Sequence, residues 1–173
     1  HLSRLRRGEK PVLVTTTIEH PATMEPAGYL ERLGAIVRRL GVDRTGRVDM
    51  DAMTKALDGA TLVSVMHSNN EVGTIQPIRE IATIARQRKI LVHTDAAQSL
   101  GKIRIDVNEL GVDLLTIAGH KLYAPKGIGV LYVRRGTKLE PLIHGASHEA
   151  GRRAGTENVP YIVGLGAASA KAQ

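Results

Sequence analysis

The sequence contains no cysteine, no phenylalanine and no tryptophan. Without cysteine, the chain cannot form a disulfide, a thiolate metal site or a cysteine nucleophile of its own. Its aromatic residues are four tyrosines, so it has few rings on which the bases of single-stranded nucleic acid could stack. Hydrophobic residues still make up 42% of the chain, and we therefore expect a core of Val, Ile, Leu, Ala and Met.

Long apolar runs are also absent. No segment approaches the roughly 20 apolar residues of a membrane-spanning helix, and no apolar segment follows the basic opening stretch HLSRLRRGEK, so we expect neither a membrane helix nor a signal peptide. The 173 residues suffice for one domain with a buried core. The chain begins at His1 rather than Met and ends in an alanine-rich run, from which we expect a piece of a longer protein.

Short apolar runs alternate with amphipathic stretches along the chain. The apolar runs predict strands at 11–16, 61–66, 90–94, 113–118 and 127–134. Apolar residues at helical spacing predict helices at 21–40, 49–57, 77–88 and 160–171. This alternation predicts an α/β fold in which helices flank a mostly parallel sheet.

Polar residues follow four of the predicted strands. The carboxyl ends of parallel strands meet at one edge of the sheet, which is where open α/β folds bind their ligands. Each residue alone is compatible with an ordinary surface loop, but together they predict a binding site at this edge. They are Glu19 and His20, then His67, Asn69, Asn70 and Glu71, then Asp95 and Gln98, and finally His120 and Lys121.

Lys121 and Asp95 are the sharpest candidates at this edge. Lys121 is compatible with a solvated loop lysine, or with an amine whose pKa burial lowers so that it becomes a Schiff-base nucleophile. Asp95 is compatible with a helix N-cap, or with a buried carboxylate that keeps a pyridinium nitrogen protonated. About one strand–helix–strand unit separates the two residues, so they can lie on neighbouring strand ends.

Three further residues carry two interpretations each. His20 either caps the loop before a helix or lies as a neutral imidazole against a planar ring and shuttles protons. Asn70 and Gln98 are either ordinary turn residues or neutral hydrogen-bond partners of a phenolate oxygen. We expect no metal site, because no histidine shows the i, i+4 pairing with Glu that is typical of zinc enzymes.

Five motifs, in order, carry a resemblance to a known family: TTTIEHPA, SVMHSNNEVGTIQPI, HTDAAQS, AGHKLYAPKGIGVLYVRR and HE…GRRAGTEN. The chain resembles the class V aminotransferases, which are pyridoxal-phosphate enzymes of fold type I, and among them the cysteine desulfurase (NifS/IscS-like) group. The resemblance covers nearly the whole chain. It implies that residues 1–173 are the central part of the large cofactor-binding domain, with a mixed, mostly parallel sheet truncated at both ends and the C-terminal small domain absent.

The resemblance also implies roles at the cofactor ring. Lys121 would form the internal aldimine with pyridoxal 5′-phosphate and move the α-proton of the substrate. His20 would stack on the ring and take part in proton transfer. Asp95 would pair with the ring nitrogen, and Gln98 and Asn70 would bond the side of the ring that carries the oxygen.

Further implied contacts concern the phosphate. His120 would approach it, as would Thr156 from the second subunit of a homodimer, with Arg153 near that interface. Two departures remove family features: Ala118 stands where the family often has Ser, and Ala124 where it usually has Gly. The upstream phosphate-binding loop of the family does not occur in this chain.

The implied function is that of a cytoplasmic cysteine desulfurase, which converts L-cysteine to L-alanine. It passes the sulfur through an enzyme persulfide to acceptor or scaffold proteins, as in iron–sulfur cluster assembly or tRNA thiolation. A chain without cysteine is not expected to complete this reaction by itself. The alternatives are a selenocysteine lyase or another class V lyase or aminotransferase. A non-catalytic basic module, suggested by the net charge of +7, fits less well, because the arginines are scattered and nucleic-acid binding needs a patch.

Overall fold

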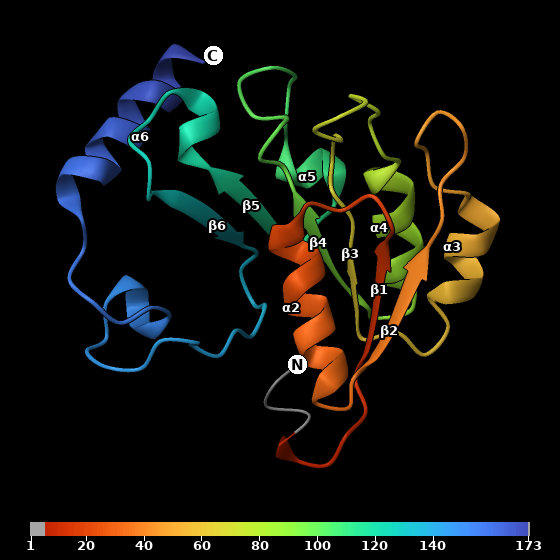
Figure 1. Ribbon diagram of the computed structural model, residues 1–173. Helices are drawn as coiled ribbons and strands as arrows, with labels where there is room; N and C mark the ends of the chain where they lie inside the picture. Colours follow the sequence, from red (N-terminus) through yellow and green to blue (C-terminus); the bar gives the residue numbers. More distant parts are fainter. Residues whose placement is uncertain (1–5, 173) are drawn as a thin grey trace.

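A computed structural model describes residues 6–172 of the chain (Figure 1). These residues contain a six-stranded sheet with the strand order β2-β1-β3-β4-β5-β6. Neighbouring strands are parallel except β5 and β6, which are antiparallel. The sheet is therefore mixed and mostly parallel, which confirms the predicted fold class. The strands are β1 (Val12–Thr16), β2 (Ile36–Leu40), β3 (Leu62–Ser64), β4 (Leu91–Asp95), β5 (Leu114–Ala118) and β6 (Gly129–Val133).

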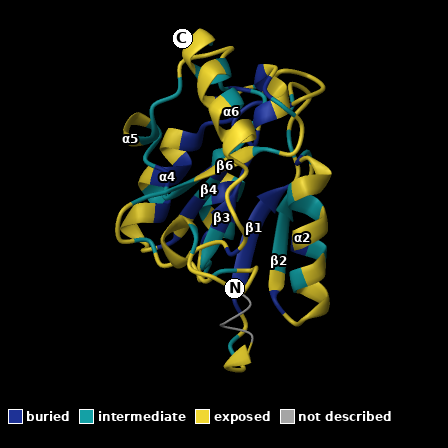
Figure 2. Cartoon of the chain, turned by 90° about the vertical axis from the view of Figure 1, so that its left-hand side faces the viewer, coloured by how far each residue is buried: buried dark blue, intermediate teal, exposed yellow. Residues whose placement is uncertain are grey.

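Helices cover both faces of this sheet. Figure 2 places α2 and α4 on opposite sides of it, with β1 buried between them. The main core lies between one face of the sheet and the helices α3 and α4, where aliphatic side chains remove apolar surface from water. The helices are α2 (Pro21–Arg32), α3 (Met50–Ala56), α4 (Ile78–Gln87), α5 (Val107–Leu110) and α6 (Val159–Lys171), with short 3-10 helices η1 (Gly119–Leu122) and η2 (Glu149–Gly151).

The helix predicted over 21–40 is wrong for residues 33–40. Helix α2 ends at Arg32, Gly34 takes a left-handed backbone with φ +98°, and Ile36–Leu40 forms β2 beside β1. The apolar residues of this stretch fit helical spacing, but Ile36 and Val37 are β-branched and favour a strand. The other predicted strands and helices are confirmed to within a few residues, whereas the short helix α5 was not predicted.

The strand order creates a point where the chain changes direction across the sheet. From β1 the chain passes through α2 to β2 on one side, and it then returns to β3 on the other side of β1. The connections that leave β1 and β3 therefore diverge, and the carboxyl ends of these two strands flank a topological switch point, where open α/β sheets bind ligands. Among residues 6–172, no helix is long and apolar enough to span a lipid bilayer.

Candidate functional site

The strands β1 and β3 separate at their carboxyl ends. Only two residue pairs, Leu13 with Leu62 and Val14 with Val63, join these strands. Beyond them, β1 continues along β2, because Thr17 N donates to the Leu40 carbonyl at 2.9 Å. The chain after β3 instead follows β4. The two strands therefore part at the switch point, and we use the word crevice below for this point of separation alone. We call the three residues after β3, Val65 to His67, the β3 extension.

Glu19 fills this crevice. Its side chain is only 7% exposed, and its carboxylate accepts hydrogen bonds from Thr16 Oγ1 at 2.7 Å and from Met66 N at 2.9 and 3.1 Å. It thus supplies Met66 of the β3 extension with the acceptor that β1 no longer offers. Burial raises the pKa of Glu19 to about 7, against the hydrogen bonds from Thr16 and Met66, which lower it, and the negative charge of Asp95 raises it further.

His20 follows Glu19 and caps helix α2. Its Nδ1 accepts a hydrogen bond from Ala22 N at 3.1 Å, and the residue is exposed. A neutral imidazole that accepts at Nδ1 carries its proton on Nε2. The capping interpretation is therefore confirmed, and no acceptor for Nε2–H occurs among residues 6–172.

Asp95 ends β4 on the other side of the β3 extension. Its backbone carbonyl accepts from His67 N at 2.8 Å, and its Oδ1 accepts from Ala97 N at 2.9 Å. The chain after Asp95 forms turns rather than an α-helix, so the helix N-cap interpretation is wrong. Among residues 6–172, no hydrogen-bond donor reaches Asp95 Oδ2, and the partly buried carboxylate keeps one oxygen for another partner.

Three polar side chains on β3, β4 and β5 bond to one another across the sheet, and the middle one is His93, two residues before Asp95. His93 Nδ1 lies 2.7 Å from Ser64 Oγ of β3, and His93 Nε2 lies 2.7 Å from Thr116 Oγ1 of β5. Burial lowers the pKa of His93, and the charge of Asp95 only partly opposes this. The imidazole is therefore neutral near pH 7. The sequence analysis assigned no role to His93, although its spacing of two from Asp95 places both on one face of the strand.

Lys121 and His120 lie in η1, directly after β5. Because Thr116 of β5 pairs with Asp95 of β4 in the parallel register, η1 leaves the sheet at the same edge as Asp95. Both Lys121 and His120 are exposed. Among residues 6–172, no segment buries Lys121, so the expected burial of its amine stays a prediction for the full-length protein.

The adjacent asparagines after the β3 extension have different positions. Asn69 is buried, donates to the Ile18 carbonyl at 3.0 Å and accepts from Glu71 N and Val72 N at 2.8 and 2.9 Å. It therefore ties this loop to the loop after β1. Asn70, the next residue of the loop, is exposed. Asn69 therefore has a structural role, whereas no hydrogen bond to the side chain of Asn70 occurs in the described part of the chain.

Gln98, Thr156 and Arg153 stand apart from this arrangement. Gln98 lies in the turns after β4, where its Oε1 accepts from Lys102 Nζ at 2.5 Å. Thr156 and Arg153 belong to the exposed segment between η2 and α6. Figure 1 shows η2 at the lower left, away from the upper edge where α2 begins and where η1 follows β5. The structure thus places His20, Asp95 and Lys121 at one edge of the sheet and leaves the two candidates of the GRRAGTEN motif in the segment before α6.

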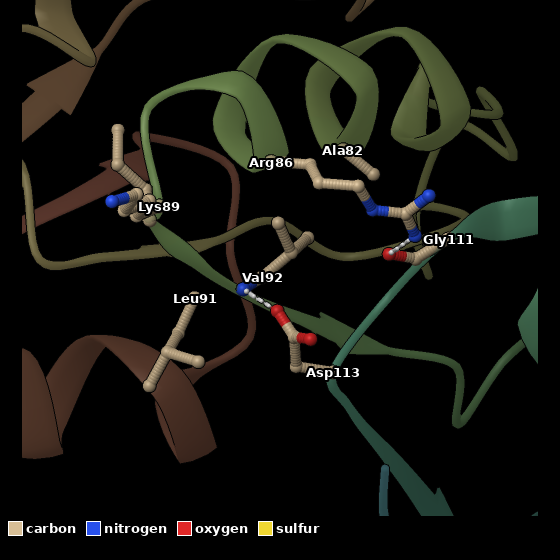
Figure 3. A pocket seen from close by; sticks show the side chains of 8 residues that line it. Ala82, Arg86, Lys89, Leu91, Val92, Gly111 and Asp113 are labelled. Atoms are coloured by element: carbon tan, nitrogen blue, oxygen red, sulfur yellow. Dashed lines mark hydrogen bonds between the residues drawn. The ribbon is translucent and has the colours of Figure 1, made fainter. Parts of the chain in front are cut away.

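A pocket of about 180 Å³ lies at the opposite end of β4 (Figure 3). It surrounds the start of β4 and the residues before β5. Its polar groups bond to one another: Asp113 Oδ2 accepts from Val92 N at 2.9 Å, and Arg86 donates to the Gly111 carbonyl at 3.2 Å. This pocket is therefore a junction between α4 and the sheet and is separate from the crevice. Among residues 6–172, no group of three or more His, Cys, Asp or Glu side chains could hold a metal ion.

With this geometry in place, comparison with known proteins identifies the family. The model of the family "Aminotransferase class-V" matches residues 2–171. The chain belongs to this family, whose members depend on pyridoxal phosphate.

Among its relatives are cysteine desulfurases. The chain is 54% identical to the cysteine desulfurase IscS of Dictyoglomus turgidum and 47% identical to the cysteine desulfurase NifS of Azotobacter vinelandii, over 90% and 95% of its length. It spans only 40% and 41% of those proteins.

Solved structures agree with this assignment. The chain superimposes on SspA in complex with cysteine with a TM-score of 0.92 at 42% identity, covering 98% of this chain and 49% of SspA. A NifS-like protein also gives a TM-score of 0.92, at 40% identity, over 99% of this chain and 48% of its own. The chain therefore has the fold of about half of each of these proteins.

The residues at the crevice fit a pyridoxal phosphate. Within the described part of the chain, Asp95 keeps a carboxylate oxygen without a donor, which suits a protonated ring nitrogen. Lys121 offers a primary amine beyond the neighbouring strand, and His20 keeps one ring nitrogen free at the third strand end. These three groups follow or end the strands β1, β4 and β5, and they lie at the edge of the sheet where open α/β folds bind ligands.

Proposed function

We propose that this chain is the cofactor-binding core of a pyridoxal-phosphate-dependent cysteine desulfurase. The observation that carries the proposal is the convergence of Asp95, Lys121 and His20 at one edge of the sheet, beside a topological switch point. The names of relatives that are 47 to 54% identical support cysteine as the substrate. Bound pyridoxal phosphate supplies an electron sink for the bonds at the substrate α-carbon.

Asp95 binds and orients the cofactor through its ring nitrogen. The free oxygen of its carboxylate accepts the N–H of a pyridinium, and its negative charge stabilises that proton. His93 lies below it as a neutral donor or acceptor. A second positive charge at His93 would compete with the pyridinium for Asp95, so the neutrality of His93 preserves the attraction.

Lys121 and His20 handle protons. The amine of Lys121 moves the α-proton of the substrate once it is within hydrogen-bond reach, as general acid–base catalysis requires. His20 stacks on the ring, and the bond from Ala22 N fixes its tautomer so that Nε2 holds the exchangeable proton. Both groups lie outside the buried core and can therefore reach a bound amino acid.

The remaining candidates bind the periphery of the cofactor. Asn70 at the rim and Gln98 after β4 bond the oxygen substituent of the ring, for which Gln98 exchanges its bond to Lys102. His120 contacts the phosphate from η1. Thr156, which is exposed in the segment before α6, contacts the phosphate of the second subunit of a homodimer.

The sulfur-transfer step needs a cysteine that these residues do not contain. We place that cysteine in a part of the protein outside this chain, from which a persulfide passes sulfur to an acceptor or scaffold protein. Selenocysteine lyase is the alternative, since both activities use the same cofactor chemistry. SspA, whose solved structure holds cysteine and resembles this chain, favours the desulfurase.

A direct test uses the full-length protein with pyridoxal phosphate and L-cysteine or L-selenocysteine. Excess dithiothreitol is present to reduce the enzyme persulfide, so that with L-cysteine we expect sulfide and alanine in equal amounts. We expect Asp95→Asn to remove nearly all of the activity, because a neutral amide does not hold the pyridinium proton. Asp51→Asn, which changes an exposed carboxylate on α3, serves as the matched control and retains activity. Product from selenocysteine alone would instead assign the lyase.

A further inference from the structure

Glu19 is a buried carboxyl group to which the proposed mechanism gives no role. Its side chain bridges two strands that have separated: it accepts from Thr16 at the end of β1 and from Met66 N in the β3 extension. Carboxylates are rarely this buried without a positively charged partner, and among residues 6–172 Glu19 has no salt bridge. A purely structural bridge could be made by a neutral side chain.

The position of Glu19 relative to Asp95 suggests more than a bridge. In the β3 extension, Met66 N–H points to the Glu19 carboxylate, while the next N–H, that of His67, points to the Asp95 carbonyl at 2.8 Å. Glu19 and Asp95 therefore hold the β3 extension from opposite sides. The charge of Asp95 acts on Glu19, and by reciprocity the charge of Glu19 acts on Asp95.

We propose that Glu19 is a positioning residue of the cofactor site, whose carboxyl fixes the crevice between β1 and β3 and whose charge strengthens the attraction of Asp95 for a cationic ring nitrogen. The inference rests on the proposed function, because it concerns the same site. Charges interact more strongly in a poorly solvated environment than in water. Ionised Glu19 adds to the negative potential at Asp95, whereas protonated Glu19 does not.

Among the buried titratable groups near Asp95 in residues 6–172, Glu19 is the one whose pKa lies near neutral pH. His67 lies in the β3 extension and His93 on β4, and burial lowers the pKa of both, so both are neutral there. His20, the N-cap residue of α2, is exposed, and its ionisation is common to wild type and a Glu19 variant. Asp95 is the one charged group among residues 6–172 that acts on the pKa of Glu19, which lies at about 7.

The test measures the dissociation constant of pyridoxal phosphate for the full-length protein between pH 6 and pH 8. Wild type is compared with Glu19→Gln, which keeps the shape and an acceptor for Met66 N. At each pH, the dissociation constant of Glu19→Gln is divided by that of wild type, because the ionisation of the cofactor affects both constants equally and cancels in the ratio. We expect the affinity of wild type relative to Glu19→Gln to rise at least about threefold from pH 6 to pH 8. The reason is that ionised Glu19, like Asp95, attracts the cationic ring nitrogen in a poorly solvated environment. The control Glu25→Gln, at an exposed position of α2, gives a constant ratio.

A second variant guards against a folding defect in Glu19→Gln. Thr16→Val removes the hydroxyl that lowers the pKa of Glu19, so the rise of affinity should move to higher pH while Glu19 itself is unchanged. Unfolding of the cofactor-free protein supplies an independent measure, because the melting temperature of wild type should fall relative to Glu19→Gln as pH rises through 7.

The outcomes separate the two proposals. A ratio that does not change with pH, in a protein that binds pyridoxal phosphate, overturns the role of Glu19 and leaves the proposed function intact. Failure of wild type to bind pyridoxal phosphate overturns both, whatever the unfolding data show. A pH-dependent ratio that Thr16→Val moves to higher pH supports the role of Glu19.

Discussion

His93 and Asp95 lie two residues apart on β4 and on the same face of the sheet, so that a neutral imidazole lies directly below the carboxylate. Hydroxyl groups hold both ring nitrogens of His93, Ser64 Oγ on one side and Thr116 Oγ1 on the other. A neutral imidazole has one donor and one acceptor. This bonding pattern therefore matches the uncharged ring, and it accounts for a histidine inside a sheet.

We predict that His93 makes the protein less stable in mild acid. Burial lowers its pKa below the ordinary value of 6.5, so the unfolded chain binds a proton more readily than the folded one. The stabilisation is complete above pH 6.5 and is lost as pH falls through the lowered pKa. His93→Gln should reduce the decrease of the melting temperature that wild type shows between pH 7.5 and pH 5. His144→Gln, at an exposed position, should leave the wild-type slope, and equal slopes in all three proteins would contradict the prediction.

Gly119 permits the close approach of η1 to β6. A Cβ at this position would lie 2.8 Å from both the carbonyl oxygen and Cγ2 of Ile128, and Gly119 N already donates to that carbonyl at 2.9 Å. We predict that Gly119→Ala destabilises the protein by about 1–3 kcal/mol, because backbone must move. The same change should weaken cofactor binding, since it displaces Lys121.

Gly166 offers the control for this substitution. It lies in helix α6, and an added Cβ would meet nothing within 4 Å. Gly166→Ala should therefore stabilise the helix by about 0.5–1 kcal/mol. Denaturant unfolding of both variants checks the prediction. A Gly119→Ala protein as stable as Gly166→Ala would show that η1 does not depend on this close contact.

The two adjacent asparagines should separate stability from binding. Asn69→Ala removes one donor and one acceptor from a buried junction, and we expect a loss of about 1–3 kcal/mol in the free energy of unfolding. Asn70→Ala changes an exposed side chain, so stability should stay within about 0.5 kcal/mol of wild type. Its affinity for pyridoxal phosphate should fall. The prediction would be wrong if Asn69→Ala lowered only the affinity for the cofactor and Asn70→Ala lowered only the free energy of unfolding.

The sequence predicted the sheet and its functional edge because both depend on local patterns. Buried parallel strands appear as apolar runs, and the residues that follow them are fixed at one edge by topology. The positions of Asp95 and Lys121 at this edge could be predicted for this reason. The strand β2 was missed because it carries Arg38 and Arg39 between apolar residues at a spacing that also fits a helix.

The environment of single side chains depends on tertiary structure and could not be predicted. Glu19 appears in the sequence as one more polar residue before a helix. Its burial follows from the separation of β1 and β3, which only the strand order creates. The roles of Asn69 and Asn70 divide for the same reason, because the partner of Asn69 is the distant Ile18 carbonyl. The exposure of Lys121 likewise depends on what the rest of the fold leaves uncovered.

The most direct test of the account identifies the lysine that binds the cofactor. The full-length protein is incubated with pyridoxal phosphate, reduced with borohydride and digested, and the modified peptide is located by mass spectrometry. We predict one stoichiometric modification on Lys121, and loss of the visible absorption band in Lys121→Ala but not in Lys126→Ala, an exposed lysine five residues along the chain. Modification of Lys102 or Lys126 instead, with an unchanged band in Lys121→Ala, would contradict the account.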